Sequence, residues 1–313
     1  MQNIVSFLRQ NDKYLILTHR HPDGDTLGSA AALCAGLRAL GKTAYLWRNP
    51  EVTERYMPYA QPYFAPEGYA YQTTVAVDTA DASLLGEGWA GTVHLRIDHH
   101  PSEGGFAELE YTDPAAAACG EVVYTLLTLL GAPLTREIAE TLYIAVTTDT
   151  GGFRYANTTA ATHRLAAVLM DTGIDAHALE RAMFSKTRSR VAVECVILSG
   201  MEYRAGGLLV LGALTLAERR SAGATEDDLV NIAGLAQSIE GVKIGLLLRE
   251  EPNGWRVSCR TAEPYAANLI CGVLGGGGHN RAAGAHIEER IATREVRRRV
   301  LNALWEIYPE LRD

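Results

Sequence analysis

The chain has 313 residues, 47% hydrophobic and 21% charged, which is enough apolar sequence for two domains that each have a core. Its formal net charge of -8 argues against binding of long nucleic acid, which needs clustered Lys and Arg. No segment has the apolar run of a signal peptide or a membrane span, so we expect a cytoplasmic protein that does not bind membranes. Five scattered cysteines without a CxxC pair argue against a disulfide framework and against a zinc ribbon.

The first half of the chain alternates short apolar runs with helical patterns. The expected elements are a helix over 4–9, a strand over 14–18, a helix over 27–40 and strands over 43–47, 73–77 and 92–97. Alternating strands and helices form a doubly wound, mostly parallel sheet, and we expect this α/β fold here. The carboxyl ends of its strands then share one edge, where such sheets bind ligands.

Side chains that commonly bind metal ions follow three of the expected strands. They are His19, His21, Asp23 and Asp25 after the first strand, Asp78 after the strand over 73–77, and Asp98, His99 and His100 after the strand over 92–97. Asp149 stands before two glycines at the end of a helix expected over 135–147. Any one acid has an ordinary explanation, such as the helix N-cap role open to Asp25 and Asp81. Their repetition at one sheet edge favours a shared site.

The ligand types indicate which metal this site binds. Carboxylates and imidazoles without thiolates favour Mn²⁺ or Mg²⁺ over structural zinc, and the histidines favour manganese. Pro22 and Gly24 let the loop bend so that Asp23 and Asp25 both face inward, toward two neighbouring ions. Two ions about 3.5–4 Å apart can aim a hydroxide at phosphorus and stabilise the phosphoryl oxygens during displacement.

The second half of the chain predicts a smaller α/β domain. We place the metal-binding domain at residues 1–186, a linker helix at 187–202 and the second domain at 203–313. Elements expected in the second domain are a strand over 208–215, a helix over 226–239, a hairpin of strands 242–249 and 256–261, a helix over 266–274, a strand over 285–288 and a helix over 294–307.

The sequence GGGGHNRAAG over 275–284 is the candidate phosphate-binding segment of this second domain. Backbone N–H groups of successive glycines can approach a phosphate closely, and His279 can add a donor; the alternative is a flexible turn. Arg260 could bind a phosphate through its planar guanidinium, with a surface ion pair to Glu263 as the alternative. Ser258 is a weaker candidate on the same strand.

In this order, the motifs resemble those of the DHH/DHHA1 phosphoesterases, and within them the bacterial nano-RNase and pAp phosphatase branch. The resemblance covers nearly the whole chain and is carried by HRHPDGDTLGS, VAVDTAD, IDHH, TTDTGGFRY, VSCRT and GGGGHNRAAG. It implies an N-terminal DHH domain, a C-terminal DHHA1 domain and an active site in the cleft between them.

Residue by residue, the resemblance implies a division of roles. His19 and Asp23 would bind one manganese, Asp25, His99 and Asp149 the other, and Asp78 would bridge both. His100 would face the scissile phosphate, and Asp98 would orient a histidine by accepting its other N–H. Gly276, Gly277, Gly278 and His279 would hold the terminal phosphate or sugar of the substrate, with Arg260 and Ser258 beside them. His21 is expected to face solvent, and Arg154 is a further candidate for a phosphate contact.

The activity implied by the resemblance is manganese-dependent hydrolysis, with Mg²⁺ as a substitute. Its substrates would be very short oligonucleotides, including linear dinucleotides such as pApA and pGpG, or adenosine 3′,5′-bisphosphate, which yields AMP. Cyclic-di-AMP hydrolysis by a member of the same family is the alternative, and a non-catalytic nucleotide sensor is a third reading. All six ligand positions hold suitable residues, which disfavours the sensor. Long duplex nucleic acid is not expected as a partner, and a homodimer is suggested by resemblance alone.

Overall fold

The computed structural model describes residues 1–101 and 105–312, and the chain divides into two compact units, Met1–Ser185 and Lys186–Asp313. The N-terminal unit is built on a five-stranded parallel sheet in the order β2-β1-β3-β4-β5. Its strands are β1 (Tyr14–Leu17), β2 (Ala44–Leu46), β3 (Thr73–Val77), β4 (Leu95–Asp98) and β5 (Leu109–Thr112). Because β1, β3 and β4 are buried on both faces, they are mostly apolar rather than alternating. The α/β fold expected from the sequence is confirmed.

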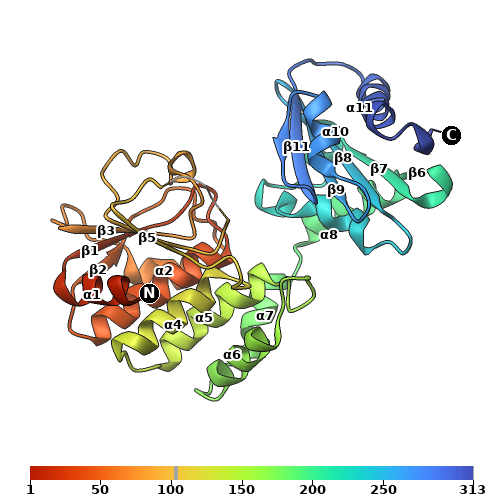
Figure 1. Cartoon of the computed structure of the whole chain (residues 1–313). Helices are drawn as coiled ribbons and strands as arrows, with labels where there is room; N and C mark the ends of the chain where they lie inside the picture. Colours follow the sequence, from red (N-terminus) through yellow and green to blue (C-terminus); the bar gives the residue numbers. More distant parts are fainter. Residues whose placement is uncertain (102–104, 313) are drawn as a thin grey trace. The chain divides into compact units, whose positions relative to one another are not determined.

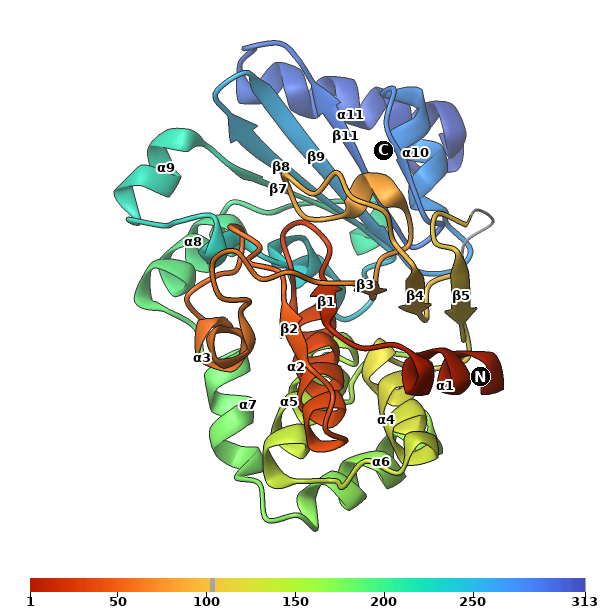
Figure 2. The same ribbon diagram turned by 90° about the vertical axis from the view of Figure 1, so that its left-hand side faces the viewer.

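Helices cover one face of this sheet, and the opposite face packs against loops. The helices are α1 (Gln2–Gln10), α2 (Gly24–Ala39), α3 (Met57–Ala60), α4 (Cys119–Leu130), α5 (Arg136–Asp149), α6 (Ala160–Met170) and α7 (Ala176–Phe184). In Figure 1, α2, α4 and α5 lie side by side below the strands. Figure 2 shows α1 at the β5 end of the sheet, next to α4. On the other face, Leu15, Leu17 and Ala76 pack against loop side chains that include Trp47 and Trp89.

Small residues let α2 lie close to its neighbours α5 and α4. A Cβ atom on Gly28 would meet the carbonyl oxygen of Thr141 at 2.4 Å, and one on Gly36 would meet Leu127 Cδ2 at 2.3 Å. These close approaches bury α2 along most of its length. The helix that follows β1 is therefore fixed in place, and its N-terminus lies at the carboxyl edge of the sheet.

Helix α2 begins at Gly24, three residues before the expected start at 27. The reason is that Asp23 caps the helix, because its side chain accepts hydrogen bonds from the backbone N–H groups of Asp25 and Thr26. The N-cap role considered for Asp25 is therefore wrong. The same role for Asp81 is confirmed, since its Oδ1 accepts a hydrogen bond from the Ser83 N–H at 2.8 Å.

The C-terminal unit has a six-stranded mixed sheet in the order β10-β11-β9-β8-β7-β6. Its strands are β6 (Glu202–Arg204), β7 (Leu209–Leu214), β8 (Ile244–Glu251), β9 (Gly254–Thr261), β10 (Gly277–Gly278) and β11 (Ala282–Ile287). Its helices are α8 (Arg188–Ser199), α9 (Leu216–Ser221), α10 (Ala267–Val273) and α11 (Thr293–Ile307). Helices α10 and α11 pack in one core with the strands, whereas Val193 and Ile197 of α8 pack in a second core with Leu247.

Two expectations about secondary structure are corrected. The helix expected over 226–239 is replaced by two 3₁₀ segments, Asp227–Leu229 and Ile232–Ser238. Asn231, which lies between them, has a left-handed φ of 56°, and this conformation cannot continue a right-handed helix. Strand β5 was not expected, because all its residues are half-buried and its LEYT sequence has no continuous apolar run. The hairpin is confirmed as the antiparallel pair β8–β9.

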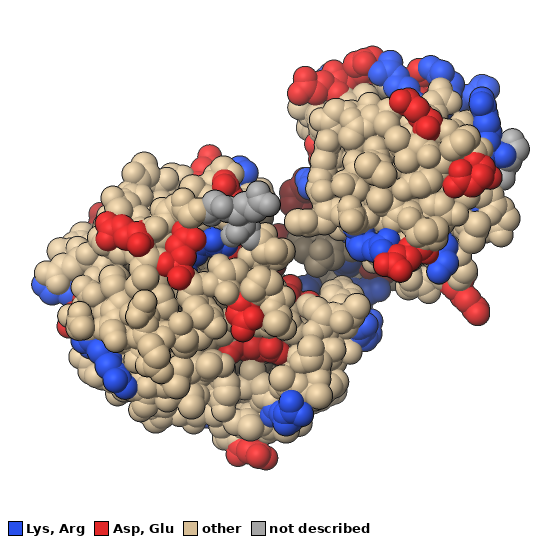
Figure 3. All heavy atoms as spheres, viewed as in Figure 1, with Lys and Arg blue, Asp and Glu red and all other residues tan. Residues whose placement is uncertain are grey.

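The surface carries both signs of charge. On the face shown in Figure 3, basic and acidic side chains of the described residues are interspersed within each unit, without an extended basic stripe on that face. Among residues 1–101 and 105–312, no helix combines the length and apolar character needed to cross a lipid bilayer.

Candidate metal centre

The six side chains expected as metal ligands lie together at the carboxyl edge of the parallel sheet. Their ligand atoms form two sets, in each of which all the atoms lie within 4.8 Å of one another: His19, Asp23 and Asp78; and Asp25, His99 and Asp149. A third set, Asp78, His99 and His100, overlaps both. The ligands come from the loop after β1, the first turn of α2, the residues that directly follow β3 and β4, and the last residue of α5. Residues far apart in the sequence therefore meet because parallel strands end at one edge.

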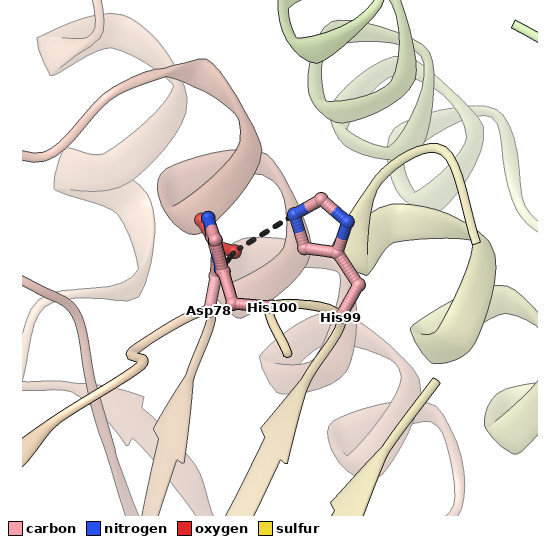
Figure 4. A group of neighbouring side chains, drawn as sticks. All are labelled: Asp78, His99 and His100. Carbon is pink, nitrogen blue, oxygen red and sulfur yellow. Dashed lines mark ion pairs between the residues drawn. The ribbon is translucent and has the colours of Figure 1, made fainter. Parts of the chain in front are cut away.

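The two oxygens of Asp78 face different ligand sets. Oδ2 lies 3.7 Å from His19 Nε2, and Oδ1 lies 3.5 Å from His99 Nε2. Figure 4 shows the His99 ring at the end of its strand, pointing toward Asp78, with His100 beside that carboxylate. The position of Asp78 between the two sets is the geometry that a bridging carboxylate needs.

Two atoms of this cluster are buried without a hydrogen-bond partner in the described part of the chain, Asp78 Oδ1 and His99 Nε2. Leaving a buried polar atom unsatisfied costs about 1–3 kcal/mol. A cation between them would satisfy both atoms, since each offers a lone pair to it. The residues present therefore fit a divalent metal ion.

The two histidines of the sets are oriented in the same way by backbone carbonyls. His19 Nδ1 lies 2.7 Å from the carbonyl oxygen of Arg20, and His99 Nδ1 lies 3.2 Å from that of Ala116. A carbonyl only accepts, so in each ring Nδ1 carries a proton and Nε2 is directed toward the cluster. Burial lowers the pKa of His19, but the carboxylates of Asp23 and Asp78 outweigh it and raise the pKa to about 9.

The carboxylate of Asp25 is held by the N-terminus of α4. Its Oδ2 accepts the Cys119 N–H at 2.7 Å, and its Oδ1 accepts the Gly120 N–H at 3.0 Å and the Ser29 hydroxyl at 2.9 Å. Such a helix end stabilises a buried anion. Burial, followed by the nearby Asp78 carboxylate, nevertheless raises the pKa of Asp25 well above its usual range.

Asp149 ends helix α5, where Asn157 returns to it from the following loop. Asn157 Nδ2 donates to the Ala117 carbonyl at 2.9 Å and to the Asp149 carbonyl at 3.2 Å, and lies 3.5 Å from Asp149 Oδ2. Burial raises the pKa of Asp149 to about 6, although His99 acts in the opposite direction. Asn157 was not expected as a site residue, because an Asn eight positions after a ligand has no recognisable spacing.

Asp98 lies behind the cluster and contacts His100 instead of the ligand sets. Its Oδ1 is 2.9 Å from His100 Nδ1 and accepts the backbone N–H groups of His99 and His100 at 2.7 and 3.0 Å. Burial raises the pKa of Asp98, but hydrogen bonds from His100 and Arg96 outweigh it and lower the pKa to about 2. Asp78 and Asp98 in turn raise the pKa of His100 to about 11. The ionised Asp98 thus holds a proton on His100 Nδ1.

Two further positions near the cluster do not join it. His21 is 82% exposed, and its Nδ1 lies 3.0 Å from Glu51 Oε1. Arg154 directs its Nε to the Gly151 carbonyl at 2.6 Å. The partner of His21 lies after β2, and that of Arg154 lies two residues after Asp149.

In the C-terminal unit, the glycine run is part of the sheet. Gly277 and Gly278 pair with Gly284 and Ala283 of β11. A Cβ atom on Gly276 would meet the carbonyl oxygen of Gly284 at 2.1 Å, whereas one on Gly277 would meet nothing within 4 Å. The backbone at Gly276 therefore demands glycine for packing, and the segment from Gly276 to His279 is exposed.

Ser258 and Arg260 lie two residues apart on β9, so their side chains share one face of the sheet. In register, they lie opposite Gly284 and Ala282 of β11. The alternative considered for Arg260, an ion pair with Glu263, is not present, because Glu263 Oε1 pairs with Arg281 Nη2 at 2.5 Å. These positions place a guanidinium and a hydroxyl on the strand next to the one that pairs with the glycine run.

Models of two protein families match the chain. The model described as the DHH family, N-terminal domain, matches residues 13–146, and the DHHA1 domain matches residues 209–308. The first covers all six ligand positions except Asp149, and the second covers β9, the glycine run and all of α11.

Similar proteins extend over most of the chain. A protein named bifunctional oligoribonuclease and PAP phosphatase NrnA, from Thermus thermophilus, is 37% identical over 276 residues, 87% of this chain and 83% of its own length. A protein of the same name from Bacillus subtilis is 27% identical over 285 residues, 87% of this chain and 89% of its own length. The crystal structure of an exopolyphosphatase-related protein from Bacteroides fragilis, 23% identical, superposes with a TM-score of 0.87, covering 100% of this chain and 97% of that one. This last likeness shows the fold.

Proposed function

The chain belongs to the DHH family and carries a DHHA1 domain, and from this premise we propose that it hydrolyses very short oligonucleotides to mononucleotides and adenosine 3′,5′-bisphosphate to AMP. The observation that carries the proposal is the pair of ligand sets that meet at Asp78. The relative from Thermus thermophilus, whose name states both activities, supports the choice of substrates.

The ligand sets assign roles to the residues of the N-terminal unit. His19 and Asp23 would hold one divalent cation, Asp25, His99 and Asp149 the other, and Asp78 both. Bound cations, Mn²⁺ in preference to Mg²⁺ because each set contains an imidazole, would supply an activated water and neutralise charge on the phosphoryl group. His100, whose Nδ1 proton is engaged by Asp98, keeps Nε2 for a hydrogen bond to the scissile phosphate or its leaving oxygen.

We assign binding of the terminal phosphate or sugar to the C-terminal unit. The segment from Gly276 to Gly278 is exposed, so a phosphate can approach its backbone, although the Gly276 N–H already donates to the Cys271 carbonyl at 2.9 Å. His279 and Arg260 offer side-chain donors. Ser258 adds a hydroxyl on the same strand face as Arg260.

A Mn²⁺-dependent hydrolysis panel tests the proposal. It compares adenosine 3′,5′-bisphosphate, a 5′-phosphorylated series from dinucleotide to pentanucleotide, cyclic-di-AMP and pyrophosphate. We expect turnover of the bisphosphate and the shortest oligonucleotides, and none with the Asp78→Ala variant. Preferred turnover of pyrophosphate, or activity that survives Asp78→Ala, contradicts the assignment, and preferred turnover of cyclic-di-AMP replaces the substrate class.

A further inference from the structure

A fully buried arginine lies directly behind the Asp98–His99–His100 motif. Arg96 is 1% exposed and stands two residues before Asp98 on β4, so both side chains leave the same face of the strand. Its Nη2 donates to Asp98 Oδ2 at 2.5 Å, and its Nε donates to the Thr79 carbonyl at 2.8 Å. Its Nη1 donates to Glu110 Oε2 of β5 at 3.2 Å. One guanidinium thus joins the ends of β3 and β4 to the middle of β5.

Packing alone does not account for a charge at this position. Burying an ion pair costs desolvation free energy, and apolar residues of similar volume in its place are often neutral or stabilising. The neighbours of Arg96 on β4, Leu95 and Ile97, are 0% exposed and apolar. A strand that served only the core would carry an apolar residue here as well.

Because of Arg96, the two carboxylate oxygens of Asp98 have different hydrogen-bond partners. Arg96 takes Oδ2, which leaves Oδ1 for the backbone N–H groups of His99 and His100 and for His100 Nδ1. The rotation of the carboxylate is therefore fixed. His100 differs in this respect from His19 and His99, whose Nδ1 atoms are held by backbone carbonyls.

We propose that Arg96 is a positioning residue for phosphoester hydrolysis, which acts through Asp98 to fix the orientation of the His100 ring and the hydrogen bond from its Nδ1–H. This inference rests on the proposed function. Among the hydrogen bonds between described residues, the Arg96 guanidinium donates to Asp98, Thr79 and Glu110 and to none of the six ligand side chains. Its loss should therefore change the orientation of the His100 ring while the six ligands remain. The hydrogen bond to Thr79, which follows Asp78, keeps the two strand ends in register.

The test is a double-mutant cycle on the full chain with adenosine 3′,5′-bisphosphate. We expect Arg96→Met and Asp98→Asn each to lower kcat by about 10- to 100-fold, the usual cost of losing a group that orients another, with little change in KM or in Mn²⁺ affinity. Because both act on His100 by one route, the double variant should lose about as much as Asp98→Asn alone. Arg96→Lys, which retains one donor, should recover part of kcat. Glu110→Gln is the matched control, since it alters another partner of Arg96 and leaves Asp98 paired, and its kcat should match the wild type.

A spectroscopic readout separates positioning from stability. In metal-free protein with ¹⁵N-labelled histidine, the His100 Nδ1–H bonded to Asp98 should give a low-field proton signal that is lost in Arg96→Met and kept in Glu110→Gln. Multiplicative losses in the cycle, or a lowered melting temperature with kcat and this signal retained, would overturn the inference. If Arg96→Met does not fold, the cycle is built on Arg96→Lys with the same two outcomes. An inactive wild type contradicts the proposed function, whereas an active wild type with a multiplicative cycle contradicts only the role of Arg96.

Discussion

The polar clusters of the two units are held in opposite ways. In the N-terminal unit, Asp25 and Asp78 are 1% and 3% exposed, and backbone or side-chain groups from other elements orient the ligands. In the C-terminal unit, Gly277 and His279 are exposed and are held mainly by pairing with β11. Buried carboxylates that are packed together repel one another and need fixed positions, whereas exposed backbone and imidazole donors can stay hydrogen-bonded to water.

The largest effect should come from removing the shared carboxylate. We expect Asp78→Asn to abolish hydrolysis, because both ligand sets lose an anionic oxygen at once. The metal-free variant should be at least as stable as the wild type, since the substitution removes repulsion between Asp78 and Asp25. Calorimetric titration with Mn²⁺ and thermal melts in EDTA measure the two effects. Unchanged Mn²⁺ binding would refute the shared role of Asp78.

The metal-free protein should lose stability as pH rises from about 4 to about 6. Asp149 has a folded-state pKa raised to about 6, above its unfolded value of about 3.9, and Asp25 is raised in the same direction. A raised carboxyl pKa gives stability that is complete below the unfolded pKa and is lost as pH rises through the folded one. The loss from Asp149 alone is on the order of 2–3 kcal/mol.

Thermal melts in EDTA across this pH range, repeated with saturating Mn²⁺, measure that loss. Mn²⁺ should reverse it, because the cations replace the bound protons. A metal-free melting temperature that stays constant or rises between these pH values would argue against mutual repulsion in the cluster.

In the C-terminal unit, Arg260→Ala should weaken substrate binding without affecting the metal cluster. A lost charge-assisted hydrogen bond of about 1.5–3 kcal/mol corresponds to a KM for adenosine 3′,5′-bisphosphate raised by about 10- to 100-fold. Mn²⁺ affinity and melting temperature should not change, because Arg260 bonds only to the Cys259 carbonyl among the hydrogen bonds of the described residues. Steady-state kinetics on Arg260→Ala and Arg260→Lys check this. A KM equal to that of the wild type removes Arg260 from substrate binding.

The smallest effect should come from two neighbouring glycines, which serve as controls for each other. Gly276→Ala should cost about 1–3 kcal/mol of stability, since its Cβ would lie 2.1 Å from the Gly284 carbonyl oxygen. Gly277→Ala meets nothing within 4 Å and should melt like the wild type. A raised KM in Gly277→Ala without loss of stability would support close approach of a phosphate. Equal KM values would indicate that the run serves strand pairing only.

The candidate metal cluster could be predicted from the sequence because the parallel topology of the sheet brings its residues together. Once β1, β3 and β4 are parallel, the residues after Leu17, Val77 and Ile97 must meet at one edge. The role of Arg96 was not predicted, because a charged residue within an apolar run is usually taken as exposed. Its burial depends on Asp98 of the same strand and on Glu110 of the neighbouring strand β5.

Tertiary contacts explain the other differences between expectation and structure. The left-handed backbone at Asn231 broke a helix whose apolar spacing looked regular. The glycine run suggested a loop, but its backbone pairs with β11 over Gly277 and Gly278. Both outcomes depend on neighbours that lie outside the local sequence window.

The N-cap role of Asp23 bears on how the two cations would come and go. The Asp23 side chain is 53% exposed, and one of its oxygens accepts hydrogen bonds from the N-terminus of α2. Asp25, in the other set, is 1% exposed and accepts hydrogen bonds from the N-terminus of α4. The set with His19 and Asp23 is thus the one open to water. A cation bound by His19 and Asp23 should exchange rapidly and dissociate first on dilution, while a cation beside Asp25 remains bound. The enzyme would then pass through a form with one cation. The affinity of the exposed set for its cation would set the metal concentration required for turnover.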